Sequence, residues 1–271
     1  MDGELTIVGA GLIGASFALA VRERFERITL LDPDDAHATY ALEHGMADAR
    51  VERVPGTAGA ILIACPSHRI AGIVESLAGH PGTVFDAGSV KGAIIREVTA
   101  ALGSTPANFV PAHPIAGREK SGPQAASADL FRGKSVILTP TGDEDVERVR
   151  QVEGWWAAAG AAVSRMDADA HDAVYARTSH LPHLIAFAYL LGIGPEDLEH
   201  TGGGFRDFSR IGASDPDMWS AIFERNRGPL ASALDSFEAH LAEFRRALVR
   251  GDVDAMHRLI ARARKARADL P

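Results

Sequence analysis

Cysteine is nearly absent from this sequence of 271 residues. The one cysteine, Cys65, cannot form a disulfide within the chain, which is typical of proteins kept in a reducing compartment. No apolar run reaches the roughly 18 residues that a membrane-spanning helix needs. The first residues, MDGELTIVGAG, also lack the charged and apolar segments of a signal peptide. We therefore expect a cytoplasmic protein without a membrane anchor.

Positive charge is scarce too, since 28 Lys and Arg stand against 36 Asp and Glu and leave a net charge of −8. Proteins that bind nucleic acids or anionic membranes usually present a basic face, so neither partner is expected. The basic residues of the last segment, RLIARARKARADL, fit a solvated helix face. Hydrophobic residues at 46% and charged residues at 24% are typical of a globular protein.

Short apolar runs alternate with segments of helical periodicity over the first 166 residues. The strand candidates are LTIVGAG, ITLLD, AILIACP, TVFDAGS, NFVPAHP, KSVILTP and AAVSRM. Parallel strands that are covered by helices on both faces read as apolar runs, so the pattern predicts an α/β domain with a parallel sheet.

Strand candidates end there, and only helical periodicity follows from Asp167 onward. One long helix is expected over DAHDAVYARTSHLPHLIAFAYLLG, and three more over residues 215–226, 227–251 and 252–270. We expect a Rossmann-type dinucleotide-binding domain over residues 1–164 and an all-α domain over residues 165–271.

The segment VGAGLIGAS follows the first strand candidate and contains Gly9, Gly11 and Gly14. In dinucleotide-binding proteins the first such glycine permits a tight turn, the second lets the backbone approach a pyrophosphate, and the third lets the helix pack on the strand. The N–H groups of Leu12 and Ile13 would then face the phosphates. The alternative is a glycine turn in an unrelated α/β fold.

Asp32 ends the second strand candidate, 18 residues after Gly14. A carboxylate at this position accepts hydrogen bonds from an adenosine ribose and would repel a 2′-phosphate. The next residues, Pro33, Asp34 and Asp35, add no cation. The sequence therefore predicts NAD rather than NADP as the cofactor.

The segment PAHPIAGREKSG places His113 at the end of the strand candidate NFVPA, and DAGSVKG places Ser89 and Lys91 at the end of another. The carboxyl ends of strands line the ligand crevice of an open α/β sheet. A neutral histidine can accept a proton from a substrate hydroxyl while hydride leaves the adjoining carbon. The alternative is a histidine that is buried for structural reasons.

Two segments of the helical half carry further polar groups. In SHLPH, His180 and His183 share one helix face, and Pro182 between them predicts a local kink. The two histidines could contact a ligand or, together with His171, hold a metal, and the alternative is that they face the core. No cysteine or carboxylate is placed to complete a metal site, so no metal is expected.

The second segment, TGGGFRDFSRIGASDPDMW, combines three consecutive glycines with Arg206 and Arg210. A guanidinium group binds a carboxylate through two parallel hydrogen bonds. Either arginine could therefore hold an acidic substrate or form a structural ion pair, Arg206 with the adjacent Asp207 in particular.

Together, the motifs GAGLIGAS, DAGSVKG, HPIAGREKSG, HDAVYARTSHLPH and GGGFRDFSRIGASDPDMW resemble those of the prephenate and arogenate dehydrogenases of tyrosine biosynthesis. These enzymes oxidise the ring alcohol of a cyclohexadienyl substrate with NAD(P)+, and the ring becomes aromatic as carbon dioxide leaves. The resemblance implies the conversion of prephenate to 4-hydroxyphenylpyruvate, with arogenate to tyrosine as an additional or preferred reaction.

The resemblance also implies roles for individual residues. His113 would take the proton of the ring hydroxyl, while Ser89 would contact the cofactor and hold that hydroxyl or orient the histidine. Arg210 would bind a substrate carboxylate. The pocket would further contain His180, His183, Glu119, Arg118 and Trp219. Many members have Thr or Ser where Arg118 stands, and an arginine there resembles the cyclohexadienyl dehydrogenases, which accept both substrates.

Other classes remain open from the sequence. Another two-domain NAD-dependent dehydrogenase, acting on a hydroxy acid or an imine, would share the glycine motif and the architecture but would not need HPIAG, SHLPH and DPDMW together. A non-catalytic NAD-binding module would keep the glycines and Asp32 but could lose His113 or Arg210.

Apolar residues recur with helical spacing near the carboxyl end, at Leu230, Leu234, Phe237, Leu241, Phe244 and Leu248. Such a stripe can pack on its own domain or on a second copy of the chain. Helical carboxyl-terminal domains of this kind favour a homodimer, which we expect here.

Overall fold

Six parallel strands form the central sheet in the computed structural model, which describes residues 1–118 and 120–270. These strands are β1 Asp2–Val8, β2 Phe25–Leu31, β3 Ala49–Arg50, β4 Ala58–Ile63, β5 Thr83–Asp86 and β6 Phe109–Val110. They lie in the order β3-β2-β1-β4-β5-β6, which is the order of doubly wound dinucleotide-binding folds. The expected α/β class is therefore confirmed.

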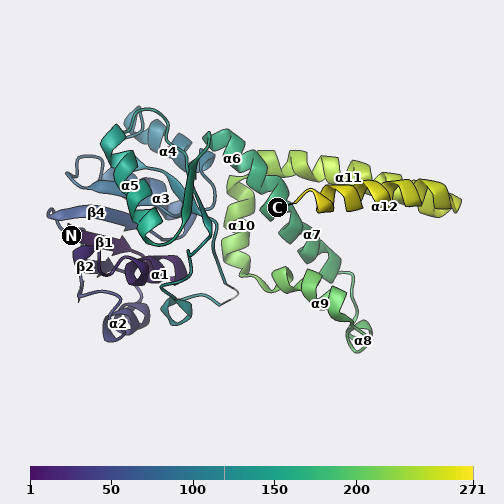
Figure 1. Ribbon diagram of the computed structural model, residues 1–271, viewed down its shortest axis with the longest axis horizontal. Helices are drawn as coiled ribbons and strands as arrows, with labels where there is room; N and C mark the ends of the chain where they lie inside the picture. The colour runs from purple at the N-terminus through teal and green to yellow at the C-terminus, as the bar shows by residue number, and fades with distance from the viewer. Residues whose placement is uncertain (119, 271) are drawn as a thin grey trace.

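The helices of this part are α1 Leu12–Ala20, α2 Asp35–Glu43, α3 Ser67–Ser76, α4 Gly92–Leu102 and α5 Val146–Ala158, and they surround the sheet (Figure 1). One buried core contains Phe17 of α1 and Trp156 of α5, and the other contains Ile70 of α3. Neighbouring residues of β4 divide between them, with Leu62 in the first core and Ile61 in the second. This alternation follows from the two-residue repeat of a strand, so the sheet is covered on both faces.

A second, three-stranded sheet departs from the single parallel sheet that the apolar runs predict. It consists of β7 Ala112–Pro114, β8 Ser135–Leu138 and β9 Ala162–Arg165, with β7 antiparallel to β8 and β8 parallel to β9. The run NFVPAHP is thus two short strands in two sheets, separated at Pro111. A proline has no N–H group to continue a ladder, and the break places His113 within β7.

The carboxyl-terminal part contains helices and no strand among its described residues, as expected. Its α-helices are α6 Ala168–Tyr175, α7 Leu181–Leu190, α8 Pro195–Leu198, α9 Gly203–Ser209, α10 Pro216–Arg225, α11 Arg227–Arg250 and α12 Val253–Ala268. A π-helix over Ala176–His180 and a 3₁₀ helix over Arg210–Ala213 complete the set. The helices α8 and α9 are not predicted by the sequence pattern, because they are short and α9 begins within the glycine run.

The π-helix joins α6 to α7 and lies just before Pro182. A proline removes the N–H group that would bind the carbonyl four residues earlier, and its ring crowds that carbonyl. The carbonyl in question belongs to Thr178, inside the π-helix. The local irregularity expected from Pro182 is therefore present, and it takes the form of one wider turn that often marks functional sites.

The helices α11 and α12 form a pair that projects from the rest of the molecule, called the arm below (Figure 1). Near its base, Leu230 is buried and Leu234 and Phe237 pack in a cluster with α7. Farther out, Leu241 and Leu248 are 53% and 69% exposed. The apolar stripe therefore packs on its own domain only at the base of the arm.

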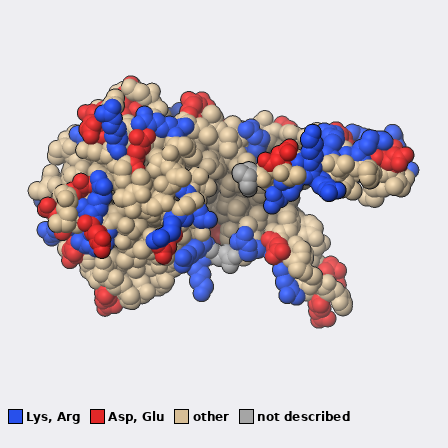
Figure 2. Space-filling model, in the orientation of Figure 1, with Lys and Arg blue, Asp and Glu red and all other residues tan. Residues whose placement is uncertain are grey.

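Lys and Arg side chains gather along the arm (Figure 2), and α12 has no buried residue among those described. The solvated basic face expected for the last segment thus lies on this helix. Within residues 1–118 and 120–270, no helix is both long enough and apolar enough to cross a membrane.

Candidate active site

The turn between β1 and α1 needs glycine at two of its three motif positions. Gly9 has φ of +105°, and a Cβ atom there would lie 2.5 Å from the carbonyl oxygen of Ala64. A Cβ atom on Gly14 would lie 2.0 Å from the carbonyl oxygen of Gly9, so this glycine lets α1 pack closely on the strand. At Gly11 a Cβ atom would meet open space, which leaves the backbone accessible to a ligand.

The amino terminus of α1 offers an anion site. The helix begins at Leu12, followed by Ile13, and its first turn contains no acidic side chain. Gly11 precedes it and supplies no side-chain cap. The first N–H groups of a helix lack partners within the helix, and the helix dipole favours negative charge beside them.

Asp32 follows β2 and is held beside the glycine turn. Its Oδ1 atom accepts a hydrogen bond from the Asp34 N–H at 2.8 Å, and its Oδ2 atom accepts one from the Ala10 N–H at 2.5 Å. The residue Asp32 as a whole is 9% exposed. It therefore stands at the carboxyl edge of the sheet, next to the start of α1.

Arg50 is a cation near Asp32 that the sequence pattern does not reveal. Its Nη2 atom donates to the carbonyl oxygen of Asp32 at 2.9 Å, and its Nη1 atom donates to Asp35 Oδ1 at 2.6 Å. The pairing of β3 with β2 brings it there, and a strand of two residues leaves no readable pattern. The carboxylate of Asp35 offsets the charge of this guanidinium group.

His113 lies buried in β7, at the head of a row of three side chains. Its Nδ1 atom is 2.8 Å from Nε2 of His171, and Nδ1 of His171 is 2.9 Å from Oδ1 of Asp172. The ring of Tyr175 packs on both histidines, with ring centroids 5.0 Å and 4.5 Å away. His113 thus belongs to the sheet domain and its partners belong to α6.

The surroundings keep His113 neutral. Burial lowers the pKa of His113 well below 6.5, and repulsion from His171, Lys91 and His180, where these groups carry charge, lowers it further. Burial also lowers the pKa of His171, although the hydrogen bond to Asp172 opposes that effect. A neutral imidazole has one bare nitrogen, which is the state that can accept a proton.

Lys91 is not at the rim of the site, where the sequence places it beside Ser89. It is fully buried and forms an ion pair with Asp86. Its Nζ atom also donates to the carbonyl oxygen of Ala112 at 2.7 Å, while Asp86 Oδ1 accepts from the Ala112 N–H at 2.9 Å. This pair clamps the residue before His113, so the half-buried Ser89 lies in a loop that is fixed to β7.

His180 is buried and faces Asn226. The Nδ2 atom of Asn226 is 2.9 Å from Nδ1 of His180 and donates to the carbonyl oxygen of Asp172 at 2.9 Å. Because an amide nitrogen only donates, Nδ1 of His180 is the acceptor and its ring proton lies on Nε2. Burial lowers the pKa of His180 to about 4, so this ring is a neutral hydrogen-bond donor.

His183, Trp219 and Arg210 come together from three elements. The ring of His183 stacks on that of Trp219, with centroids 3.6 Å apart and planes at 22°. Burial lowers the pKa of His183, and the charge of Arg210 contributes to the lowering. His183 Nδ1 donates to the carbonyl oxygen of Ser179 at 2.9 Å. The structure thus groups the four helical residues predicted for the substrate pocket, since His180 also meets Trp219 edge to face at 6.0 Å.

The remaining candidates are less informative. Arg118 is exposed and donates to the carbonyl oxygen of Ala125 at 3.2 Å, and Arg206 is exposed beside Thr201. Glu119 lies outside the described residues. Within residues 1–118 and 120–270, no group of three or more His, Cys, Asp or Glu side chains could hold a metal ion.

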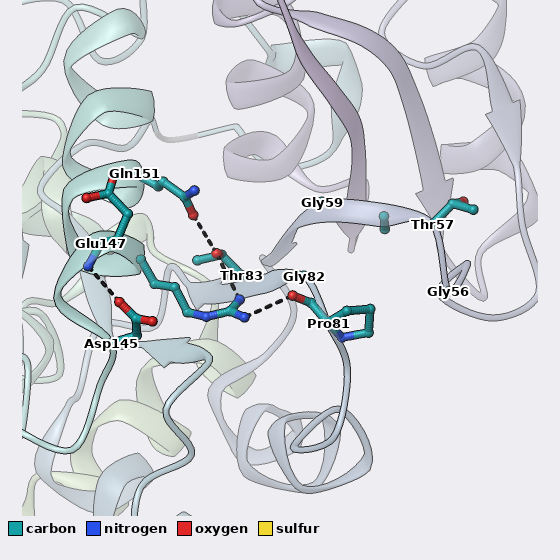
Figure 3. Close-up of a pocket in the computed structure, with 11 residues that line it drawn as sticks. Gly56, Thr57, Gly59, Pro81, Gly82, Thr83, Asp145, Glu147 and Gln151 are labelled. Atoms are coloured by element: carbon teal, nitrogen blue, oxygen red, sulfur yellow. Dashed lines mark hydrogen bonds between the residues drawn. The ribbon is translucent and has the colours of Figure 1, made fainter.

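A hollow of about 350 Å³ lies at the opposite edge of the sheet (Figure 3). It is bordered by Gly59 and Thr83, near the amino ends of β4 and β5, and by α5. Arg148 donates to the carbonyl oxygen of Pro81 at 2.9 Å and to Thr83 Oγ1 at 3.2 Å, and Thr83 donates to Gln151 at 2.7 Å. These polar side chains bind one another, so we assign the hollow no role in catalysis.

Comparisons with known proteins agree with this geometry. The family model described as prephenate dehydrogenase, nucleotide-binding domain, matches residues 17–165, and the model described as prephenate dehydrogenase, dimerization domain, matches residues 167–262. The chain is 32% identical to the cyclohexadienyl dehydrogenase of Zymomonas mobilis, over 98% of this chain and 95% of that protein.

Two solved structures are similar over nearly the whole chain. Prephenate dehydrogenase from Aquifex aeolicus, in complex with hydroxyphenyl propionate and NAD+, is 34% identical with a TM-score of 0.86 and covers 99% of this chain and 96% of its own. Arogenate dehydrogenase from Synechocystis is 25% identical with a TM-score of 0.82 and covers 98% of this chain and 99% of its own.

Proposed function

The chain belongs to the prephenate dehydrogenase family, and we propose that it oxidises prephenate with NAD+ to 4-hydroxyphenylpyruvate and carbon dioxide. The family expected from the motifs is thereby confirmed. The observation that carries the proposed reaction is the position of His113. It is a neutral, buried histidine beside the clamped loop of Ser89, held by α6 of the helical part that also contains His180 and His183.

The cofactor site proposed for NAD+ is the turn between β1 and α1. Gly9 and Gly14 shape this turn, while Gly11, Leu12 and Ile13 would present N–H groups to the pyrophosphate. Asp32 would accept hydrogen bonds from the adenosine ribose. NAD+ supplies the hydride acceptor of the reaction, and the relative from A. aeolicus was solved with NAD+.

The substrate would lie between the nicotinamide side of the sheet and the helical group. Arg210 would bind a carboxylate, and the Nε2–H group of His180 would donate to the substrate. The stacked His183 and Trp219 would form an apolar wall. Glu119 and Arg118 keep the pocket roles that the motifs imply as part of the same proposal.

The chemistry assigned to His113 is acceptance of the ring hydroxyl proton. As this proton moves to the imidazole, electron density on the oxygen rises and helps hydride to leave the same carbon. The electrons of the bond to the ring carboxylate enter the ring as carbon dioxide leaves, and aromatisation makes the step favourable. The proton then returns to the phenol oxygen, so overall only hydride and carbon dioxide are lost.

The experiment that tests this function measures NADH formation by absorbance at ~340 nm, with prephenate and arogenate offered separately. Turnover of prephenate with the higher kcat/KM supports the proposal, and a preference for arogenate would replace the substrate but keep the reaction. No turnover of either, in protein shown to bind NADH, would contradict it. If Arg118 favours the more negative prephenate, Arg118→Thr should lower the kcat/KM for prephenate relative to that for arogenate.

The two domains proposed here meet between β9 and α6. β9 ends at Arg165 and α6 begins at Ala168, which lies close to the boundary at residues 164 and 165 that the sequence pattern predicts. The homodimer is proposed through the arm, where exposed apolar residues continue the stripe beyond the part that packs on α7.

A further inference from the structure

We infer that His171 and Asp172 are positioning residues, which fix the ring proton of His113 on Nδ1 and leave its Nε2 atom bare toward the substrate. This role rests on the proposed function, because it concerns the histidine to which the base function is assigned. From the sequence, the role suggested for His171 is that of a metal ligand, and no role is predicted for Asp172.

The position of each proton follows from the donors and acceptors in the row. A carboxylate only accepts hydrogen bonds, so Asp172 requires the proton of His171 on Nδ1 at 2.9 Å. Nε2 of His171 is then bare and must accept from His113 Nδ1 at 2.8 Å. The second nitrogen of His113 is therefore the only proton acceptor left in that ring.

Two features keep the ring protons of His171 and His113 on their Nδ1 atoms. His171 is fully buried and Asp172 is 3% exposed, so water cannot replace either partner. Burial alone would raise the pKa of Asp172, but hydrogen bonds from His171 and from the backbone N–H groups of Lys91 and Gly92 lower it. Asp172 therefore stays ionised and continues to require a donor.

Asp172 also fixes the row to the sheet domain. Its Oδ1 atom accepts from the Lys91 N–H and its Oδ2 atom from the Gly92 N–H, both at 2.9 Å. These groups start α4, whose N-cap residue Lys91 provides no side-chain cap, so a carboxylate from α6 caps α4. A Cβ atom on Gly92 would lie 2.8 Å from Asp172 Oδ2, which makes this glycine necessary for the approach.

The clamp around Lys91 closes the connection. The same residue that donates its backbone N–H to Asp172 donates its side chain to the carbonyl oxygen of Ala112, next to His113. Asp172 and His113 are thus both tied to one rigid loop. The orientation of His113 therefore depends on the packing of α6 against the start of α4.

The experiment uses the full-length protein labelled with ¹⁵N at histidine, because ¹⁵N chemical shifts distinguish a protonated ring nitrogen from a bare one. The signals of His113 are assigned by their loss in His113→Asn. We expect a protonated Nδ1 and a bare Nε2 in the unmodified protein at neutral pH. A proton on Nε2 would overturn the inference, and this result does not depend on any substrate.

The second measurement is kinetic and uses His171→Phe, which keeps a ring but removes both hydrogen bonds. We expect a loss of kcat on the order of 100-fold, an unchanged KM for NAD+, and a second tautomer in the His113 spectrum. The matched control is His44→Phe, since His44 is exposed and its ring stack and its side-chain hydrogen bond, to the carbonyl oxygen, are both with Tyr40 of α2. Unchanged kcat and unchanged His113 signals in His171→Phe would contradict the role.

The two measurements separate this inference from the proposed function. A correct tautomer in a protein that turns over neither prephenate nor arogenate would refute the function but keep the proton arrangement. Turnover of prephenate by a protein whose His113 proton lies on Nε2 would support the function but refute the proton arrangement. If His171→Phe does not fold, the spectrum of the unmodified protein still decides.

Discussion

Asn226 and His180 are joined across the helical part by a hydrogen bond of 2.9 Å between Nδ2 and Nδ1. Asn226 is 1% exposed and His180 is 2% exposed. The amide nitrogen also donates to the carbonyl oxygen of Asp172, so it cannot turn away without losing a second bond. His180 is therefore held neutral, with its proton on Nε2, and protonating it in the folded state is unfavourable.

Acid should destabilise the protein through His180. Its pKa is about 4 in the folded state, below the ordinary value of 6.5, so the unfolded state binds this proton first as pH falls. Stability is fully present above pH 6.5 and is lost as pH falls toward 4. Between about pH 7.5 and pH 5 the loss from this residue is about 2 kcal/mol.

Urea unfolding at these two pH values measures the effect. His180→Gln should lose roughly 2 kcal/mol less than the unmodified protein over the same interval, whatever its stability at neutral pH. His44→Gln, at an exposed position, serves as the control. An equal loss in His180→Gln and in the unmodified protein would exclude His180 as the source.

Replacement of His113 should separate catalysis from cofactor binding. His113→Asn keeps a polar side chain but cannot accept the hydroxyl proton, so kcat should fall by about 10²- to 10⁴-fold. The affinity for NADH, measured by fluorescence titration, should stay unchanged because the glycine turn and Asp32 lie elsewhere at the edge of the sheet. Loss of both kcat and the affinity for NADH would indicate that His113 mainly supports the structure.

The rate should stay constant well into weakly acidic solution. Since burial keeps the pKa of His113 well below 6.5, the ring remains neutral and able to accept a proton as pH falls through neutrality. We expect kcat to be level between about pH 8 and pH 6.5 and to fall only at lower pH. A pH series under saturating substrate measures this, and an acid limb centred at or above 6.5 would disagree with it.

The sequence predicts most of the fold because its signals are local. The glycine motif, the apolar strands and the helical periodicity after residue 166 each depend on neighbouring residues, and all are present in the structure. The small second sheet is different. Pro111 interrupts a run that reads as one strand, and the pairing of β7 with β8 joins residues far apart in the chain, which no local pattern contains.

The site is predictable in part for the same reason. His113, His180, His183, Arg210 and Trp219 lie in motifs, and the four helical residues lie near one another in the structure. The orienting row is not visible from the sequence, because His113 is separated from its partner His171 by 58 residues. One usable signal exists: His171 and Tyr175 lie four apart on α6, on a face that points toward His113.

Cofactor choice should depend on the balance between Asp32 and Arg50. The unmodified protein should use NAD+ with a lower KM than NADP+, because the Asp32 carboxylate would repel a 2′-phosphate and Asp35 holds Arg50. Asp32→Ser should raise kcat/KM for NADP+ relative to NAD+ by about 10-fold or more, since it removes the carboxylate that repels the 2′-phosphate while Arg50 remains close by. Asp35→Asn is the control, because it releases Arg50 but keeps the repelling carboxylate. A lower KM for NADP+ in the unmodified protein would contradict the assignment.

The arm should hold two copies of the chain together. Leu241 and Leu248 are exposed on one face of α11, and the residues 167–262 match a family model described as a dimerization domain. Sedimentation at micromolar concentration should give twice the 28.7 kDa mass of one chain.

The double variant Leu241→Asp and Leu248→Asp should sediment as one chain, because two carboxylates would have to lose their water in the interface. Ser232→Asp adds a charge on the opposite face of α11, two and a half turns before Leu241, and should leave the dimer intact. A single-chain mass for the unmodified protein would exclude the homodimer.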